Sequence, residues 1–345
     1  MKIVCFGELM LRLAPYGKMK FLQEPNFNAT FGGGEANVAV SLANYGEKAK
    51  FVTKLPKNDI ADAAIRELKG LGVCVCGITR GGDRIGIYYV EKGAAMRPSK
   101  VIYDRAYSAI SQATESDFNW DELLDGADWF HFTGITPALG KNVASITEKA
   151  LIEAKKKGLT VSCDLNYRKK LWTKEEARET MSKLMKYVDI CIANEADADD
   201  VFGIKGEISD VEVGKLNRAE YESVAKQLTN KFGFKAVAIT LRESISADDN
   251  NWGAMLYKDG KALYSKTYSI HIVDRVGGGD SFGAGLIYGL NHYENAQDAL
   301  EFAVAASALK HTIEGDYNRV SVQDIESLMK GNASGRVQRQ WLNLQ

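Results

Sequence analysis

Short apolar runs alternate with amphipathic stretches along most of the chain. The runs have strand length, and in the stretches between them apolar residues recur every three or four positions, as on one face of a helix. The runs that predict strands are residues 3–6, 51–55, 129–133, 159–165, 188–193 and 236–241. The stretches that predict helices, several of them followed by a glycine, are residues 35–45, 60–71, 142–157, 279–293 and 296–313. This alternation favours an α/β fold in which a mainly parallel sheet is flanked by helices in three layers.

Two segments break the alternation, because strand-like patterns follow one another there with no helix between them. They are residues 11–31 and 84–105, the second of which contains the alternating run from Ile85 to Val90. We expect them to form a small sheet that projects from the main domain and acts as a lid over a cleft. The remaining predicted parts are an α/β core of residues 1–10, 32–83 and 106–330 and a loosely held tail of residues 331–345.

The composition is ordinary for a globular protein. Hydrophobic residues make up 45% of the 345 residues and charged residues 26%. The formal net charge of -1 provides no electrostatic attraction to nucleic acid or to an anionic membrane surface. The N-terminus leads directly into a predicted strand without the features of a signal peptide, and no stretch approaches the ~20 apolar residues of a membrane helix. We therefore expect a cytoplasmic protein whose partners are neither nucleic acid nor membrane.

A glycine-rich segment at the start of a predicted helix carries the densest chemical signal. Gly277, Gly278 and Gly279 are consecutive, so no Cβ shields their amides, and the following helix adds unpaired N–H groups and the positive end of its dipole. Such a nest of amides can bind an anion, for example a phosphoryl group in transfer. Asp280 follows directly, where a carboxylate either takes a proton from an attacking hydroxyl group or caps the helix. The residues by themselves leave both roles open.

The same segment resembles a family signature. Residues 274–285 are similar to the second signature of the ribokinase-like carbohydrate kinases, D-x-x-G-A-G-D-x-F-x-x-G, with Gly278 in place of the usual alanine. The first signature of that family, G-G-x-x-x-N-x-A, is present at residues 32–39. A dinucleotide-binding fingerprint, the rival interpretation of this early glycine cluster, does not fit its spacing or its distance from the first strand. The resemblance covers nearly the whole chain and implies a ribokinase-like fold with a β lid, with ATP bound near the carboxyl ends of the strands. It also implies that Asp280 is the base and that the glycine amides hold the transferred phosphoryl group.

Two arginine-containing segments narrow the choice of sugar. The segment from Asp164 to Trp172 and the triplet Tyr103-Asp104-Arg105 both resemble 2-keto-3-deoxygluconate kinases. Arg105 and Arg168 in one pocket would suit a substrate with a carboxylate, because guanidinium groups pair with carboxylates in a bidentate manner. The alternatives are a surface position for Arg105, a structural ion pair for Arg168 and a helix-ending role for Asp316. The residues implied to bind the sugar are Gly32, Gly33, Gly34, Asn37, Tyr88, Tyr103, Arg105, Arg168 and Asp316.

The nucleotide side departs from the family pattern in two places. The family motif N-x-x-E, linked to magnesium through water, is present as Asn194-Glu195-Ala196-Asp197, so a shorter acid replaces the glutamate, and Glu195 or Asp199 could stand in for Asp197. Arg242 occupies a position where related kinases have a glycine, in an expected loop that continues through the polar residues 246–251. The resemblance implies ATP and Mg²⁺ as cofactors. The residues implied to contact them are Asn194, Thr240, Arg242, Gly277 and Gly279, with Asp197 as the acid linked to the metal.

These features together predict an ATP-dependent kinase of a six-carbon keto-acid sugar, with 2-keto-3-deoxygluconate as the expected substrate and its 6-phosphate as the product. One alternative is a kinase of a neutral sugar such as fructose or ribose, and another is a catalytically silent binding protein of the same fold. The exposed strand edges of the lid favour pairing between subunits, so we expect a homo-oligomer. His311 either lines the adenine site or is an ordinary core or surface histidine.

Overall fold

A computed structural model of the chain describes residues 1–194, 196–206 and 218–332. Glu195, one alternative for the predicted metal-linked acid, and residues 333–345 of the predicted tail lie outside the described residues. The strands are β1 (Lys2–Phe6), β2 (Met10–Ala14), β3 (Asn28–Gly32), β4 (Lys48–Leu55), β5 (Cys74–Arg80), β6 (Gly86–Glu91), β7 (Lys100–Asp104), β8 (Trp129–Thr133), β9 (Thr160–Asp164), β10 (Ile190–Asn194), β11 (Ala236–Ser244), β12 (Asp249–Lys258), β13 (Lys261–Tyr264) and β14 (Tyr268–His271). The α-helices are α1 (Gly34–Asn44), α2 (Asp59–Gly70), α3 (Trp120–Leu123), α4 (Lys141–Lys156), α5 (Lys174–Leu184), α6 (Asp197–Phe202), α7 (Arg218–Phe232), α8 (Gly278–His292), α9 (Ala296–Lys310) and α10 (Val322–Met329).

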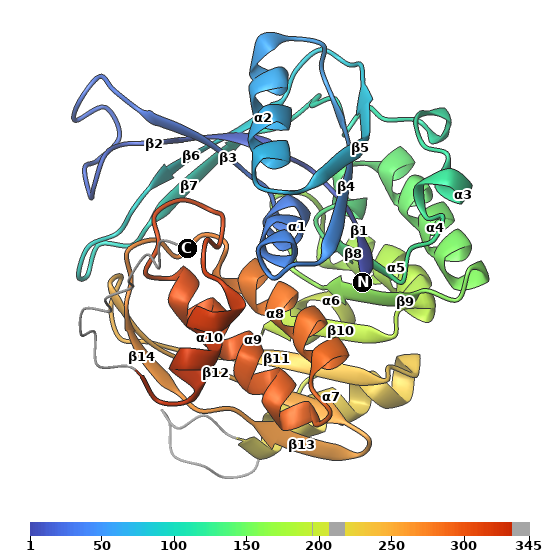
Figure 1. Cartoon of the computed structure of the whole chain (residues 1–345), viewed down its shortest axis with the longest axis vertical. Helices are drawn as coiled ribbons and strands as arrows, with labels where there is room; N and C mark the ends of the chain where they lie inside the picture. The colour runs from blue at the N-terminus through green and yellow to red at the C-terminus, as the bar shows by residue number, and fades with distance from the viewer. Residues whose placement is uncertain (195, 207–217, 333–345) are drawn as a thin grey trace, which may run out of the picture.

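A large sheet forms the centre of the molecule (Figure 1). Within the described residues it has ten strands in the order β13-β12-β11-β10-β9-β8-β1-β4-β5, with β14 paired to β12. The strands from β11 to β5 in that order run parallel, whereas β12, β13 and β14 are antiparallel additions at one edge. The predicted fold class, a mainly parallel sheet flanked by helices, is therefore confirmed.

Helices cover both faces of this sheet because successive side chains of each strand point to opposite sides. In β1, Ile3 and Cys5 belong to one apolar core, and Val4 and Phe6 belong to another. The first core includes residues of α1, α2, α8, α9 and α10, and the second includes residues of α3, α4, α5, α6 and α7. The result is a three-layer arrangement (Figure 1).

A second, smaller sheet projects from one side of the molecule (Figure 1). Its strands lie in the order β3-β2-β6-β7, and β2 pairs antiparallel with β3 and parallel with β6. β6 and β7 form an antiparallel pair, so β3 and β7 are the edges. β2 begins at Met10 and β3 ends at Gly32, so this sheet reaches slightly beyond the predicted segment 11–31. The predicted small sheet is present.

The predicted loop around Arg242 and residues 246–251 is wrong. β11 continues through Arg242 to Ser244, and β12 begins at Asp249, so that residues 245–248 alone form the turn. The polar composition favoured a loop, but β12 is hydrogen-bonded to β11 on one side and to β14 on the other. Ladder hydrogen bonds on both sides, together with the burial of Asn250, stabilise a strand whose side chains are polar.

The longest of the described helices, α4, has 16 residues, whereas a helix that crosses a lipid bilayer needs about 20. None of those in the described ranges has both the length and the apolar character needed to cross a membrane.

Candidate active site

A cavity of about 370 Å³ opens at the carboxyl ends of the parallel strands. This is the edge where open α/β sheets bind their ligands. Many of the residues that line it were predicted from the sequence: Gly33, Gly34, Asn37, Tyr88, Tyr103, Arg105, Arg168, Asn194, Asp197, Thr240, Arg242, Gly277, Gly279, Asp280 and Asp316. Gly32 and Gly278, which were also predicted, lie behind its wall, since a side chain at Gly32 would collide with Asp316 and one at Gly278 with the ring of His311.

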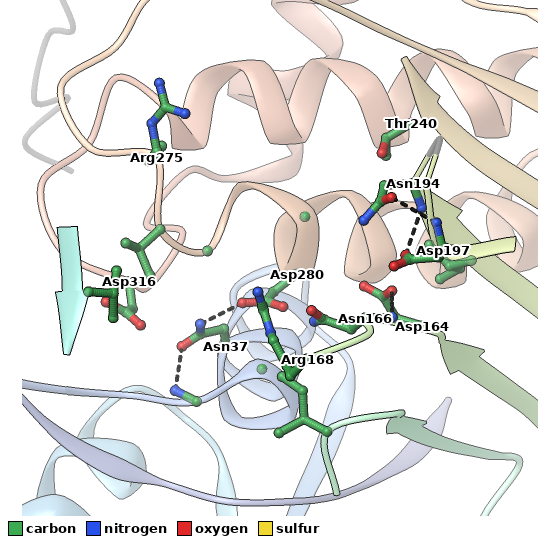
Figure 2. A pocket seen from close by; sticks show the side chains of 18 of the residues that line it. Asn37, Asp164, Asn166, Arg168, Asn194, Asp197, Thr240, Arg275, Asp280 and Asp316 are labelled. Atoms are coloured by element: carbon green, nitrogen blue, oxygen red, sulfur yellow. Dashed lines mark hydrogen bonds between the residues drawn. The ribbon is translucent and has the colours of Figure 1, made fainter. Parts of the chain in front are cut away.

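Asp280 lies in the first turn of α8 with its carboxylate in this cavity. Its Oδ2 accepts a hydrogen bond from Nδ2 of Asn37 at 2.7 Å, and Asn37 Oδ1 accepts one from the amide of Gly33 at 3.3 Å. Burial raises the pKa of Asp280 to about 6, while the Asn37 hydrogen bond opposes the rise and the charge of Asp316 adds to it. Figure 2 shows Asp280 beside Asn37 and Arg168. The carboxylate is held in place and has the pKa of a usable base.

The glycine nest forms the other half of this arrangement. Gly277 caps α8 in a left-handed conformation with φ 83°, which a side chain would strain, and a Cβ there would also meet the carbonyl oxygen of Asp316. The amide of Gly278 donates to the carbonyl of Arg275 at 3.3 Å. In the described backbone no carbonyl accepts from the amides of Gly279 and Asp280, so these donors are free for an anion.

The early glycine turn closes the cavity from the side of α1. A Cβ at Gly33 would collide with the carbonyl oxygen of Glu8, and one at Gly34 would lie 3.5 Å from Oδ1 of Asp280. Glu35 anchors the start of the helix, because its Oε1 accepts bonds from the amide and the hydroxyl of Thr133 at 2.9 and 2.8 Å. The close approach of Gly34 to Asp280 brings the two signature segments against each other.

The two predicted arginines have different surroundings. Arg168 is exposed, lines the cavity and forms no ion pair within the described residues. Arg105 is buried and already paired with Glu8, and its guanidinium carbon lies 5.3 Å from the ring centre of Tyr103. The structural ion pair considered for Arg168 is therefore absent from the described part of the chain, and the surface position considered for Arg105 is wrong.

Asp197, at the nucleotide end, is engaged with backbone amides. Its Oδ2 accepts from the amide of Asn194 at 3.0 Å and its Oδ1 from the amide of Tyr167 at 3.2 Å. Burial raises the pKa of Asp197, and burial together with the charges of Asp197 and Asp280 raises that of Asp164 well above its usual value. Among the described residues no group of three or more His, Cys, Asp or Glu side chains could hold a metal ion. Carboxylates that reach Mg²⁺ through water nevertheless fit its preference for oxygen ligands and retained waters.

Several residues at the cavity were not predicted as site residues. Asn250 and Trp252 of β12 line it, and Asn250 Oδ1 and Trp252 Nε1 are buried without a hydrogen-bond partner in the described structure. His311, for which the sequence left two roles open, also lines it, with its ring centre 4.9 Å from that of Trp252. Arg275 lines it from the start of the nest (Figure 2). The polar residues of β12 gave no signal because they were assigned to a loop.

The sequence and the fold are similar to those of known carbohydrate kinases. The chain matches the family model for pfkB family carbohydrate kinases over residues 1–322, so it belongs to that family. The class that the fold and the site define is thus a carbohydrate kinase, which transfers a phosphoryl group to an alcohol of a sugar. The predicted family and enzyme class are confirmed.

The similar proteins include kinases of 2-dehydro-3-deoxy sugar acids, where 2-dehydro is the systematic term for 2-keto. A crystal structure of a 2-dehydro-3-deoxygluconokinase from Thermotoga maritima is 54% identical, with a TM-score of 0.91, and the match covers 96% of this chain and 98% of that one. A 2-dehydro-3-deoxygalactonokinase from Haloferax volcanii is 31% identical over 334 residues, which are 97% of this chain and 98% of the relative. A 2-dehydro-3-deoxygluconokinase from Thermoproteus tenax is 26% identical over 336 residues, which are 95% of this chain and 94% of the relative.

Proposed function

We propose that this carbohydrate kinase transfers the terminal phosphoryl group of ATP to the primary hydroxyl group of a six-carbon 2-keto-3-deoxy sugar acid, with 2-keto-3-deoxygluconate as the preferred substrate and its 6-phosphate as the product. The observation that carries the proposal is the Asp280 carboxylate, held by Asn37 at 2.7 Å beside the free amides of the glycine nest. The names of the similar proteins support the same class of substrate. The cytoplasm, where ATP is available, is the expected location.

The proposed chemistry needs a proton acceptor and an anion site side by side. Asp280 takes the proton of the sugar hydroxyl group while the hydroxyl oxygen attacks the terminal phosphorus of ATP, and ADP leaves with the electrons of the broken P–O bond. The free amides of Gly279 and Asp280 are proposed to donate to the transferred phosphoryl oxygens, and the N-terminus of α8 adds a positive dipole end. With a pKa of about 6, Asp280 is mostly ionised at neutral pH and still basic enough to accept a proton.

ATP is proposed to lie along the carboxyl ends of β10 and β11. Asn194, Thr240 and Arg242 line the cavity there, and Arg242 supplies a positive charge for the phosphates. Bound Mg²⁺ would neutralise phosphate charge and orient the transferred group. Asp197 suits a contact through water, because both of its oxygens already accept backbone amides.

The small sheet is proposed to act as the lid over the sugar. Tyr88 of β6 and Tyr103 of β7 line the cavity from this sheet and stack at 6.1 Å. Ile102 on the edge strand β7 is 53% exposed, so we propose that two copies pair through this edge as a homo-oligomer. The division into a core of residues 1–10, 32–83 and 106–330 and a lid of residues 11–31 and 84–105 is part of the same proposal.

A coupled assay of ADP release across a panel of sugars tests the proposed function. The panel contains 2-keto-3-deoxygluconate, its galactonate-derived epimer, fructose and ribose, each with MgATP. We expect turnover with the two keto acids and little with the neutral sugars. Preference for a neutral sugar would contradict the proposal and favour the alternative, a kinase of a neutral sugar. One observation supports that alternative, because Glu8 already neutralises the charge of Arg105. No ADP release with any sugar would indicate a binding protein.

Arg168 is expected to recognise the substrate carboxylate. Arg168→Ala should raise KM for 2-keto-3-deoxygluconate by about 10- to 100-fold, because a hydrogen bond to a charged group contributes about 1.5–3 kcal/mol, and should leave KM for ATP nearly unchanged. The matched control is Lys169→Ala, since Lys169 is the next residue, is also exposed and is not part of the cavity wall. Equal KM values for the two variants would show that Arg168 does not bind the sugar acid.

The pH dependence of turnover should follow Asp280. Its pKa is raised to about 6, and the base works only when ionised, so kcat/KM should fall about tenfold for each pH unit below 6 and level off above it. Steady-state rates between pH 4.5 and 8, with folding checked by circular dichroism at each pH, measure this limb. A rate that is constant down to pH 5 in the folded protein would rule out Asp280 as the base.

A further inference from the structure

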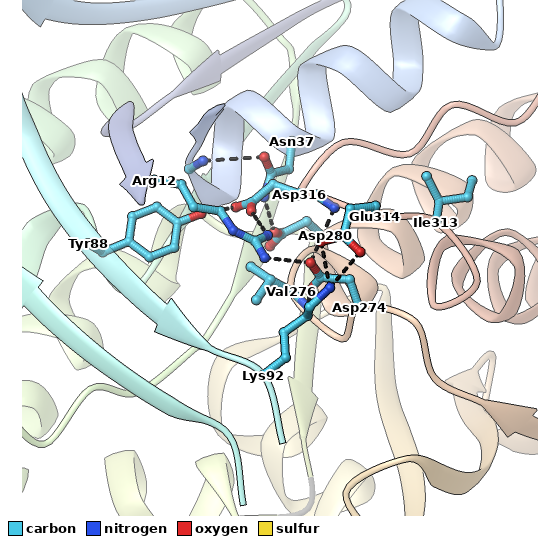
Figure 3. Close-up of polar contacts among 12 residues, drawn as sticks. Arg12, Asn37, Tyr88, Lys92, Asp274, Val276, Asp280, Ile313, Glu314 and Asp316 are labelled. Carbon is cyan, nitrogen blue, oxygen red and sulfur yellow. Dashed lines mark hydrogen bonds and ion pairs between the residues drawn. The ribbon is translucent and has the colours of Figure 1, made fainter. Parts of the chain in front are cut away.

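Arg12 is a fully buried arginine that joins the small sheet to the glycine nest. It lies on β2 and is 1% exposed. Its Nη2 pairs with Oδ2 of Asp274 at 2.5 Å, and its Nη1 pairs with Oδ1 of Asp316 at 2.6 Å. Figure 3 shows its side chain between the two carboxylates, with Tyr88 approaching Asp316 from the small sheet. One guanidinium group therefore bridges two loops that are distant in sequence.

The two carboxylates shape the loops on either side of the nest. Asp274 Oδ1 accepts the amide of Val276 at 3.1 Å, and Asp274 Oδ2 accepts the amide of Gly315 at 3.2 Å. The carbonyl oxygen of Asp316 packs where a Cβ of Gly277 would be, so the position of Asp316 limits the position of the nest. A shift of either carboxylate would move the amides that are proposed to hold the phosphoryl group.

The charged groups around Arg12 also balance one another beside Asp280. Arg12 and Lys310 face Asp274 and Asp316, and Tyr88 donates its hydroxyl to Asp316 Oδ2 at 2.5 Å. The groups that act on Asp280 from the elements around it are Asn37 of α1, Asp164 and Arg168 at and after β9, Lys310 of α9, and Asp316. The charge of Asp316 disfavours ionisation of Asp280, and Arg12 neutralises that charge.

We propose that Arg12 is a positioning residue that couples closure of the small sheet to the shape of the glycine nest and to the charge around the proposed base. This inference rests on the proposed function. Arg12 does not line the cavity, so it acts through Asp274 and Asp316 rather than on the substrate itself. Its forked guanidinium can engage both carboxylates at once, which the ammonium group of a lysine does less well.

Lys92 provides a matched control for the test. It follows β6 in the same small sheet and pairs with Glu314 at 2.6 Å, in the loop that leads to Asp316 (Figure 3). Lys92→Met therefore removes an ion pair between the small sheet and the same loop, but it does not touch Asp274, Asp316 or the nest. We expect its kcat to stay within about twofold of the wild type, because a partly exposed ion pair contributes little to stability and the contacts of Asp274 and Asp316 remain in place.

The experiment compares the wild type with Lys92→Met, Arg12→Lys and Arg12→Gln. It measures kcat, KM and the acid limb of kcat/KM, which is the fall of kcat/KM at low pH that is attributed to Asp280. Arg12→Lys keeps the charge but loses the forked guanidinium that contacts both carboxylates. Its kcat should therefore fall about 100-fold, while the acid limb stays at the same pH as in the wild type. Arg12→Gln also removes the charge, so the acid limb should move to higher pH by up to about one unit. The double variant Arg12→Gln/Asp316→Asn removes one charge of each sign and should return the limb toward the wild-type position.

The outcomes separate this inference from the proposed function. No turnover by the wild type with any sugar acid would mean that the proposed function fails. If the wild type is active and the kcat of Arg12→Lys equals that of Lys92→Met, the proposed role of Arg12 is wrong. A folded Arg12→Gln variant with a lower kcat and an unmoved acid limb would also overturn it, because that result assigns Arg12 to packing alone. If Arg12→Gln does not fold, the kcat of Arg12→Lys decides.

Discussion

Replacing Asp280 with Asn is expected to lower kcat by about a thousandfold while leaving KM for sugar and for ATP nearly unchanged. The amide has the same shape as the carboxylate, and its oxygen can still accept the 2.7 Å hydrogen bond from Asn37, so the fold and the binding of both substrates should persist. The amide cannot take the hydroxyl proton, so the loss falls on the chemical step. Steady-state kinetics with 2-keto-3-deoxygluconate and MgATP measure the effect.

A second variant provides the control for Asp280. Asp280→Glu keeps a carboxylate but moves it by one methylene group, so it should retain more activity than Asp280→Asn and less than the wild type. An Asp280→Asn variant that keeps more than a tenth of the wild-type kcat would show that the carboxylate is not the base.

Gly277→Ala is expected to damage both the stability of the fold and the reaction. The φ of 83° costs a residue with a Cβ about 1–2 kcal/mol, and that Cβ would also meet the carbonyl oxygen of Asp316. Relief of this collision must move the nest amides away from the phosphoryl group, and loss of one such donor lowers kcat by about 100- to 1000-fold. Chemical denaturation and steady-state kinetics measure the two effects.

Gly158→Ala is the matched control for Gly277. Gly158 follows α4 with φ 76°, and a Cβ there has no atom within 4 Å, so this variant carries the backbone strain without the collision. We expect it to lose about 1 kcal/mol of unfolding free energy and to keep the wild-type kcat. If Gly277→Ala keeps the kcat of Gly158→Ala, the nest does not hold the transferred group.

The sequence predicted best what depends on local pattern. Six strands of the large sheet and five of the described helices, α1, α2, α4, α8 and α9, were predicted from the apolar pattern, and β8 was predicted with its observed bounds, Trp129–Thr133. The closeness of Asn37 and Asp280, which are 243 positions apart, could be anticipated because each lies in a family signature. The helix predicted for residues 296–313 ends earlier, at Lys310, since helix ends depend on tertiary contacts more than on composition.

The sequence predicted less well what depends on partners from distant segments. Arg12 alternates with Leu11 and Leu13, a pattern typical of a strand residue that faces solvent. In the fold, however, Arg12 is buried and pairs with Asp274 and Asp316. Arg105 was expected to face a substrate carboxylate, and Glu8 had no signal that would make it the partner. Ion pairs of this kind depend on where the small sheet meets the core, which no local pattern encodes.

The proposed activation of the sugar hydroxyl by Asp280 beside the glycine nest is best tested by a crystal structure with 2-keto-3-deoxygluconate, Mg²⁺ and a non-hydrolysable ATP analogue. We expect the primary hydroxyl oxygen to lie within about 3.2 Å of an Asp280 carboxylate oxygen. We also expect the terminal phosphate to accept hydrogen bonds from the amides of Gly279 and Asp280. A hydroxyl oxygen more than about 5 Å from Asp280, with the carboxylate turned out of the cavity, would rule out Asp280 as the base.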